Sequence, residues 1–567
     1  MAGIGRAPRG MVVSSNALAG GTAYTILRRG GNAVDAAIAA SAVMCVAEPH
    51  RSGLGGDGCW MIHDPTEGGA RAINATGPAA QLATIDYLGE KGYDATVPVR
   101  GPLSALTVPG AVDGWRLAHE RWPGMEWSDL FEDALRYARE GVPAGRSLAG
   151  WIQEELDALK EHPSAGQLFL RRGEPREEGE RVVLRGLAET LERIAQDGTR
   201  EGFYEGDVAE RICDALEAAG SPLRPEDFAA YEAEWTAPFS DNYRGNTLYE
   251  LPPNSQGIAA LQILKLMEGF DVARWGDDTA DYYHAMAEAT KLAFADRDAW
   301  VTDPKSVTLP ISQLLDESYL AERRELIRED RAAEAEAVEA GVPFKASAFR
   351  TRRLKRAADG GEAEETEGGG TVPAVGFGAA TCLCVIDDAG LAVSAVHSLN
   401  GVFGSMEVGG DTGVLLHNRG AAFRLDEDHP NRLEPGKRTF HTLMPAMMFR
   451  DHRPWLILGV TGGESQPQTQ AAIVSRLLDF GQELQQAIDA PRWRVGGPGS
   501  IEPSGLMLES AVRDEVAEEL ERRGHPVHRP TERNEALGQA YAIRLDWRHG
   551  ALEGGVDPRG EGLAVGY

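Results

Sequence analysis

The sequence predicts an α+β fold in which helices and antiparallel sheets form layers. Residues 112–330 carry apolar residues at i, i+3 and i+4 between polar intervals, which is typical of amphipathic helices. Residues 381–399 and 445–460 alternate with a period of two around short turns, which indicates two β-hairpins. A double glycine at 462–463 then leads into a helix of about four turns. Hairpin strands pair antiparallel, so a doubly wound parallel sheet is not expected.

The N-terminal part is expected to begin with a buried helix. Residues 31–49, GNAVDAAIAASAVMCVAEP, are rich in alanine and small apolar residues, and Pro49 ends the helix at or before its own position. The glycine-dense RSGLGGDGCWMIHD, residues 51–64, follows as a loop that runs into a strand. It matches neither the dinucleotide fingerprint nor a Walker motif, so its glycines indicate a close backbone approach to another element.

Residues 329–375 differ in composition from the helical region before them. EDRAAEAEAVEAG, residues 329–341, is a charged helix candidate, and the stretch after it is poor in apolar residues and ends in three glycines at 368–370. Such a composition cannot bury enough surface to order itself. We therefore expect a flexible connector at about 329–375 that delivers the chain to the first hairpin.

Charge and cysteine content exclude several classes of function. With 57 basic and 87 acidic residues the formal charge is −30, which disfavours nucleic acid and membrane partners. The five cysteines form no CxxC pair, so neither disulfides nor a zinc site is expected, and Cys382 and Cys384 are predicted to be buried apolar side chains. We expect no metal and no organic cofactor. No apolar run approaches the ~18 residues of a membrane span, and no signal peptide is seen, so a cytoplasmic location is expected.

The junction between the connector and the first hairpin, GFGAATCLCVID at residues 376–387, is the candidate reaction centre. The chain has neither a GxSxG elbow nor an HExxH pair. If the backbone is cut here, a threonine at the new N-terminus would supply a hydroxyl nucleophile, and its α-amine, with a pKa of about 7.7–8.0, would serve as base. Gly462 and Gly463 are candidate oxyanion donors before a helix N-terminus, against the alternative of a plain strand-to-helix turn.

A set of motifs follows in order along nearly the whole chain. They are GGNAVDAAIAASAVMCVAEPHRSGLGGDG (30–58), VPGAVDGW (108–115), PPNSQG (252–257), KLAFADRDAWVTDP (291–304), PGKRTFHTLMPAM (435–447), TGGESQPQ (461–468) and DAPRWR (489–494). This combination resembles the γ-glutamyltranspeptidase (γ-glutamyltransferase) family of N-terminal nucleophile hydrolases. The FHTLMPAM and GGESQPQ forms are most similar to a hydrolase-like branch. The resemblance implies a four-layer αββα sandwich.

The resemblance also implies site residues. In the family, the nucleophilic threonine lies seven residues before the aspartate that closes the first strand, and the chain is cut just before it. The same count from Asp387 reaches Ala380, so the implied cleavage site lies between Ala379 and Ala380, with Thr381 as a one-residue alternative. The other implied residues are Ser398 and Asn400 beside the nucleophile, Gly462 and Gly463 as the oxyanion pair, and His441 and Thr442 where the glutathione-processing branch has two serines.

The positions that bind glutamate in the family are altered here. The arginine that holds the α-carboxylate falls near Ala75 or Thr76, and the acid that holds the α-amino group falls near Ala422. Loss of a bidentate guanidinium removes a strong contact, which puts the γ-glutamyl group in doubt as the substrate but not another acyl or amide group. The candidate replacement cations are Arg100, Arg419 and Arg438, against the alternative that each is an ordinary surface arginine.

The implied function is that of an autoprocessing amidohydrolase or acyltransferase for a small acyl-amide, present here in a nucleophile-substituted, uncleaved form. Residues 1–379 would form a helix-rich large segment and 380–567 a small segment, joined in one αββα unit. The active form would be a heterodimer of the two pieces, and a homodimer is also expected. Two alternatives stay open. One is a relative from antibiotic biosynthesis that hydrolyses an acyl C–C bond, and the other is a natural pseudoenzyme that serves as a binding protein.

Overall fold

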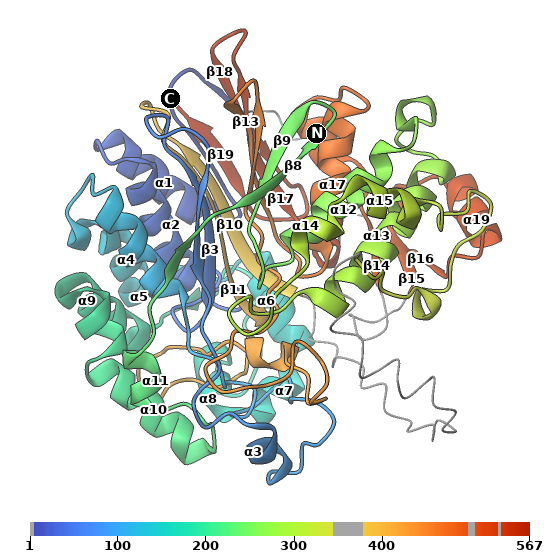
Figure 1. The fold of residues 1–567 in the computed structure, drawn as a ribbon. Helices are drawn as coiled ribbons and strands as arrows, with labels where there is room; N and C mark the ends of the chain where they lie inside the picture. Colours follow the sequence, from blue (N-terminus) through green and yellow to red (C-terminus); the bar gives the residue numbers. More distant parts are fainter. Residues whose placement is uncertain (1–4, 344–377, 497–504, 531–533) are drawn as a thin grey trace.

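The computed structural model describes residues 5–343, 378–496, 505–530 and 534–567. Two seven-stranded sheets lie face to face, and helices cover the outer side of each sheet (Figure 1). The layers therefore follow one another as helix, sheet, sheet and helix, which confirms the predicted α+β sandwich.

The first sheet holds the candidate junction on its central strands. All neighbouring strands pair antiparallel. Their order is β19 (Leu563–Gly566), β2 (Met11–Ser14), β10 (Gly378–Ile386), β11 (Ala392–Gly401), β3 (Asp57–His63), β4 (Arg71–Ala75) and β7 (Glu234–Thr236). Strand β10 thus lies between β2 and its own hairpin partner β11, so the predicted first hairpin is confirmed.

The second sheet is built from the middle and the end of the chain, and it is also antiparallel throughout. Its order is β1 (Gly5–Ala7), β18 (Ala551–Val556), β17 (Ala540–Asp546), β13 (Arg453–Val460), β12 (Ala446–Arg450), β9 (Asn246–Glu250) and β8 (Phe239–Tyr243). Strands β12 and β13 form the second predicted hairpin. Helix α17 (Ser465–Leu478) follows β13 after the double glycine, as expected.

Helices from the N-terminal half cover the first sheet (Figure 1). They are α1 (Ala17–Arg28), α2 (Ala33–Ala47), α4 (Ala111–Arg121), α5 (Glu132–Glu140) and α9 (Arg185–Thr199), with α10 (Asp207–Ala219) and α11 (Pro225–Ala229) further out. Every residue of α2 is buried, and this helix packs on β10 and β11. The buried helix predicted before Pro49 is therefore confirmed.

The second sheet is covered mainly by helices from the middle and C-terminal parts of the chain. They are α12 (Gly257–Glu268), α13 (Ala280–Trp300), α15 (Glu317–Arg324), α17, α18 (Leu484–Asp489) and α19 (Asp514–Arg522). Shorter peripheral elements are α3 (Ile85–Gly89), α6 (Arg146–Glu154), α7 (Leu156–Glu161), α8 (Pro163–Phe169), α14 (Ile311–Leu314), β5 (Val142–Pro143), β6 (Arg181–Val182), β14 (Trp493–Gly496), β15 (Gly505–Leu508) and β16 (Val527–His528). Among the helices in the described ranges, none combines the length and the apolar character that a bilayer crossing requires.

The two faces of β10 pack against different layers. Cys382 and Cys384 are fully buried in the core between the sheets, together with Ile457 and Tyr541 of the second sheet. Leu383 lies on the opposite face, in the core that includes α2. Side chains alternate between the two faces of a strand, so the positions of Cys382 and Leu383 indicate which face each neighbouring residue of β10 occupies. The predicted apolar role of the two cysteines is confirmed.

The connector differs from its prediction where the structure describes it. Residues 329–341 do not form a helix: only a 3-10 turn, Ala335–Ala337, is present. The backbone bonds instead to side chains of α13, with the Ala333 N–H donating to Glu288 at 3.0 Å and the Gly341 N–H donating to Asp296 at 2.7 Å. This first part is therefore packed against the body of the protein and is not a free connector. Residues 344–377 lie outside the described part of the chain.

Candidate active site

A β-bulge marks the junction between Ala379 and Ala380. Ala379 pairs with Asn400 and Thr381 pairs with His397, so two residues of β11 lie opposite Ala380 alone. Ala380 is 1% exposed and belongs to the core between the two sheets. Bulges redirect side chains and are frequent beside active sites. The predicted nucleophile position thus lies between the sheets, on the same face as Cys382.

Thr381 points in the opposite direction to Ala380. It shares the face of Leu383, toward the helical layer that contains α2. Its side chain is fully buried, and its hydroxyl forms no hydrogen bond with the part of the chain that the structure describes.

Ser398 contacts the backbone at the predicted cleavage site. Its hydroxyl donates a short hydrogen bond to the carbonyl oxygen of Ala379, and its oxygen accepts from the Asn400 N–H at 2.7 Å. A donor on a carbonyl oxygen stabilises the negative charge that develops there when a nucleophile attacks. The structure therefore brings Ser398, Ala379 and Asn400 together.

Asn400 is held in a strained backbone conformation. Its φ is +73°, a left-handed value that costs a residue other than glycine of order 1–3 kcal/mol. The side-chain amide donates to the backbone oxygen of Asn418 at 3.2 Å and to its side-chain oxygen at 3.1 Å. These bonds fix Asn400 opposite Ala379.

The predicted oxyanion glycines lie against the start of β10. Gly462 and Gly463 have φ values of +105° and +58°, and they join β13 to the N-terminal end of α17. A Cβ built on Gly378 would collide with the backbone of Gly463, so the two segments touch through glycine alone. The structure thus places the glycine pair beside the junction.

Two buried side chains hold the glycine turn. The Gln256 side-chain amide donates to the carbonyl oxygens of Gly463 at 3.0 Å and of Thr442 at 2.8 Å. Arg297 is 2% exposed and donates to Gln256 at 3.0 Å and to Glu464 at 3.0 Å. Gln256 and Arg297 were not among the predicted site residues, although each stands inside a family-like motif. Gln256 and Arg297 hold the glycine turn through contacts with residues that are close in the fold but distant in the sequence.

His441 is part of a buried charged cluster around Asp57. Its Nε2 lies 2.9 Å from the Asp57 carboxylate, while its Nδ1 accepts from the Leu443 N–H at 3.2 Å. Burial, with a further contribution from Arg419, lowers the pKa of His441 to about 4, so this ring is neutral at pH 7. Burial alone would raise the pKa of Asp57, but His417 and His441 outweigh it and hold this pKa below its usual value. Asp57 was not predicted as a site residue, although it lies in the GGDG motif.

Thr442 links this cluster to Arg419. The Arg419 Nη1 donates to the Thr442 hydroxyl at 3.2 Å. Arg419 is 2% exposed and Arg438 is 7% exposed, so the alternative of ordinary surface arginines is wrong for both.

The other two predicted cations are fixed by the protein itself. Arg438 donates to the Thr76 carbonyl oxygen at 2.8 Å and to Glu234 at 2.5 Å. Arg100 donates to the carbonyl oxygens of Val402 and Gly404 at 2.6 Å each, and it also forms an ion pair with a glutamate. These contacts explain the positions of both side chains and give no support to a substrate-binding role.

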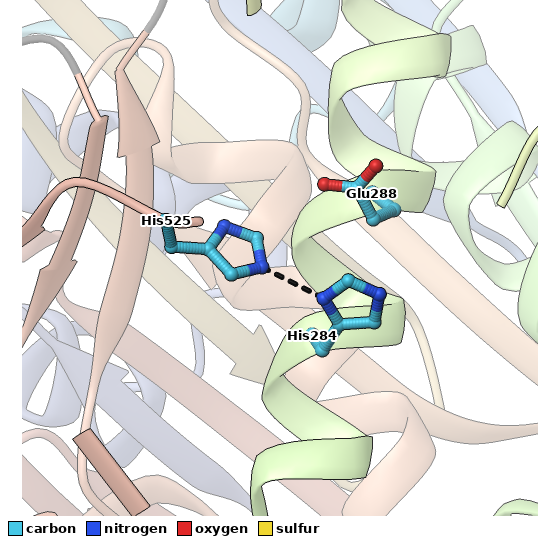
Figure 2. A group of neighbouring side chains, drawn as sticks. All are labelled: His284, Glu288 and His525. Atoms are coloured by element: carbon cyan, nitrogen blue, oxygen red, sulfur yellow. Dashed lines mark hydrogen bonds between the residues drawn. The ribbon is translucent and has the colours of Figure 1, made fainter. Parts of the chain in front are cut away.

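In the described part of the chain, one group of three side chains has the composition of a metal site. Figure 2 shows His284 and Glu288 on α13 and His525 after α19, with ligand atoms that lie within 4.8 Å of one another. The two rings already share a hydrogen bond of 2.8 Å, and His284 also bonds to the Arg328 carbonyl oxygen. Glu288 forms an ion pair with Lys291 at 2.6 Å. The facing atoms are thus paired within the protein.

The sandwich and the strand that begins at the junction define a class of protein. A crystal structure of cephalosporin acylase from Bacillus halodurans matches all of this chain with a TM-score of 0.88 and 32% identity, and 97% of that chain is covered. The fold is therefore that of the N-terminal nucleophile hydrolases.

Within this class, the chain belongs to the γ-glutamyltranspeptidase family, whose model matches residues 19–567. It is 40% identical over 556 residues to the glutathione hydrolase-like YwrD proenzyme of Bacillus subtilis, with 98% of each chain covered. It is 36% identical over 564 residues to the oxamate amidohydrolase proenzyme of Klebsiella pneumoniae, again with 98% of each chain covered. The family and the fold implied by the motifs are thus confirmed.

Proposed function

We propose that this protein is an autoprocessing amidohydrolase or acyltransferase whose reaction centre is the Ala379–Ala380 junction. The observation that carries the proposal is the hydrogen bond from the Ser398 hydroxyl to the Ala379 carbonyl oxygen. The same strand start packs against Gly462 and Gly463, which lie beside a helix N-terminus where backbone N–H groups favour negative charge. A peptide bond with a donor on its carbonyl is prepared for attack by a neighbouring hydroxyl.

The residue at 380 decides whether that attack takes place. A threonine hydroxyl there would bond to the Ala379 carbonyl carbon while the bond from that carbon to the nitrogen of residue 380 breaks, and its proton would pass to the freed amine. Water would then hydrolyse the ester, leaving a carboxylate on Ala379 and a free N-terminal threonine that acts as nucleophile and base. Alanine has no hydroxyl, so this chain is the uncleaved form. The opposite direction of Thr381 supports position 380 as the nucleophile position.

The proposed substrate is a small acyl-amide other than a γ-glutamyl compound. The relatives are named for glutathione hydrolase-like, oxamate amidohydrolase and cephalosporin acylase proteins, which supports amide hydrolysis. The positions near Ala75 and Ala422, where the family resemblance places the glutamate-binding groups, carry neither a cation nor an acid.

The test of this proposal is activity after Ala380→Thr. The variant is incubated with oxamate, glutathione and cephalosporin C, and released amine and acid are identified by mass spectrometry, with the unchanged chain as control. We expect the variant alone to hydrolyse oxamate or cephalosporin C, and we expect it to leave the γ-glutamyl bond of glutathione intact. A processed variant that hydrolyses none of them would contradict the amidohydrolase assignment, and an acid released by C–C cleavage would favour the biosynthetic alternative.

A non-catalytic binding protein is the second candidate, and Ala380 itself favours it. A protein of that kind does not need an oriented Ser398 hydroxyl or a strained Asn400 at the junction. An Ala380→Thr variant that folds, stays whole and hydrolyses nothing would favour this second function.

A further inference from the structure

Arg419 differs from the other buried arginines near the site in its hydrogen bonding, because only one side of its guanidinium group has an acceptor among the described residues. Its Nη1 donates to Thr442, while Nε and Nη2 are buried and form no hydrogen bond with any residue that the structure describes. A buried donor without an acceptor destabilises the folded protein, and a charged donor does so more strongly. An acceptor supplied by a bound molecule would remove this cost.

Arg419 lies between the two halves of the candidate site. It directly follows Asn418, whose oxygens hold the Asn400 amide opposite Ala379. On its other side it bonds to Thr442, whose carbonyl oxygen shares the Gln256 amide with Gly463. Arg419 is therefore tied to both the junction strand and the oxyanion turn.

Among the described residues, no carboxylate forms a direct ion pair with this guanidinium. Burial lowers the pKa of Arg419 to about 10, so the group is still charged at pH 7, and Asp57 favours that charge electrostatically. The Asp57 oxygens, however, accept from the N–H groups of Gly77 and Gly110 and lie against His441. The Nε–Nη2 edge therefore has no acceptor among the described residues.

We propose that Arg419 binds a carboxylate of the substrate through its Nε and Nη2 atoms. Those two donors lie on one edge of the guanidinium and match a carboxylate in bidentate geometry. The inference rests on the proposed function and deepens it. In an acyl-transfer reaction the amine product leaves first, and the acyl group stays bound to the enzyme. Because Arg419 is enclosed by the protein, the carboxylate that it binds belongs to this acyl group. The substrate class is a monoamide of a short dicarboxylic acid.

The test is direct binding to the chain as it stands, with Ala380 in place. Calorimetric titrations compare oxamate, malonamate, succinamate and glutaramate with the corresponding uncharged diamides. We expect at least one monoamide to bind about ten times more tightly than its diamide, and Arg419→Gln to remove that preference. Arg419→Lys should keep part of it, since lysine retains the charge but not the fork. Arg432→Gln, an exposed arginine paired with Glu434, is the matched control and should change nothing.

Three results would overturn the inference: equal binding of monoamides and diamides, a preference that survives in Arg419→Gln, or binding of no probe. If Arg419→Gln does not fold, the monoamide–diamide comparison on the unchanged chain and on Arg419→Lys decides the question. Binding needs no hydroxyl at position 380. A failure of self-cleavage after Ala380→Thr, which bears on the proposed function, therefore stays separate from this result.

Discussion

The Ser398 hydroxyl donates a hydrogen bond to the carbonyl oxygen of Ala379, one residue before the predicted nucleophile position. A β-bulge makes this contact possible, because Ser398 and Leu399 together oppose Ala380. The same serine oxygen accepts from Asn400, so one side chain fixes both the carbonyl to be attacked and the residue opposite it. Self-processing should therefore depend on Ser398.

Ser398→Ala in an Ala380→Thr background should slow self-cleavage by about 100-fold, the effect of removing one oxyanion donor. The rate is followed as loss of the full-length band on denaturing gels. Ser394→Ala is the matched control, because Ser394 is also a buried serine of β11 and its hydroxyl bonds to Leu458 in the second sheet. Equal cleavage rates in the two variants would show that the Ser398 contact has no part in processing.

Gly462→Ala should destabilise the fold more than a Gly→Ala change at an unconfined glycine that also has a positive φ. A Cβ at 462 would lie 2.6 Å from the Gly538 Cα, in addition to the strain of a φ of +105°. Gly481 is the matched control, since its φ is +63° and no described residue lies within 4 Å of a Cβ there. We expect Gly462→Ala to lower the free energy of unfolding by about 1–3 kcal/mol more than Gly481→Ala. Urea unfolding measures both, and equal losses would mean that the turn is not confined by Gly538.

The stability of the protein should fall as pH decreases below about 6.5. Burial lowers the pKa of His397 to about 3, so the folded ring stays neutral where the unfolded ring, with a pKa of about 6.5, takes up a proton. The folded-state pKa is depressed, so the contribution is fully present above pH 6.5 and decreases as pH falls toward 3. For one such histidine the loss is about 2 kcal/mol at pH 5.

His397→Gln should therefore reduce the loss of unfolding free energy between pH 7 and pH 5 by about 2 kcal/mol. Urea unfolding at both pH values measures this difference. His452→Gln, which changes an exposed histidine, is the control and should keep the full pH dependence. If both variants keep it, the acid sensitivity has another origin.

The sequence predicts elements well where the signal is local. The apolar run before Pro49 and the alternation around residues 381–399 and 445–460 lead to α2 and to the two hairpins. The prediction of a helix at 329–341 is wrong, because backbone N–H groups there donate to Glu288 and Asp296, which lie far away in the sequence. Helix propensity is a local property and does not include such tertiary contacts.

Some residues of the candidate site can also be predicted from local motifs, whereas others depend on tertiary contacts. Ser398, Asn400 and the glycine pair follow from motifs, and the structure brings them to one place. From the sequence alone, Arg419 is either a candidate cation or an ordinary surface arginine. Its burial depends on Thr442 and on the cluster around Asp57, and no pattern within a single segment reveals that environment.

The most direct measurement of the central claim is the fate of the chain after Ala380→Thr. We expect the variant to cut itself into residues 1–379 and 380–567, with the introduced threonine found as the new N-terminus by mass spectrometry, while the unchanged chain stays whole. Cleavage should persist when Thr381→Ala is added, because Thr381 faces the helical layer. A folded variant that remains a single chain, or an unchanged chain that is cut before Thr381, would contradict the assignment of position 380 as the nucleophile position.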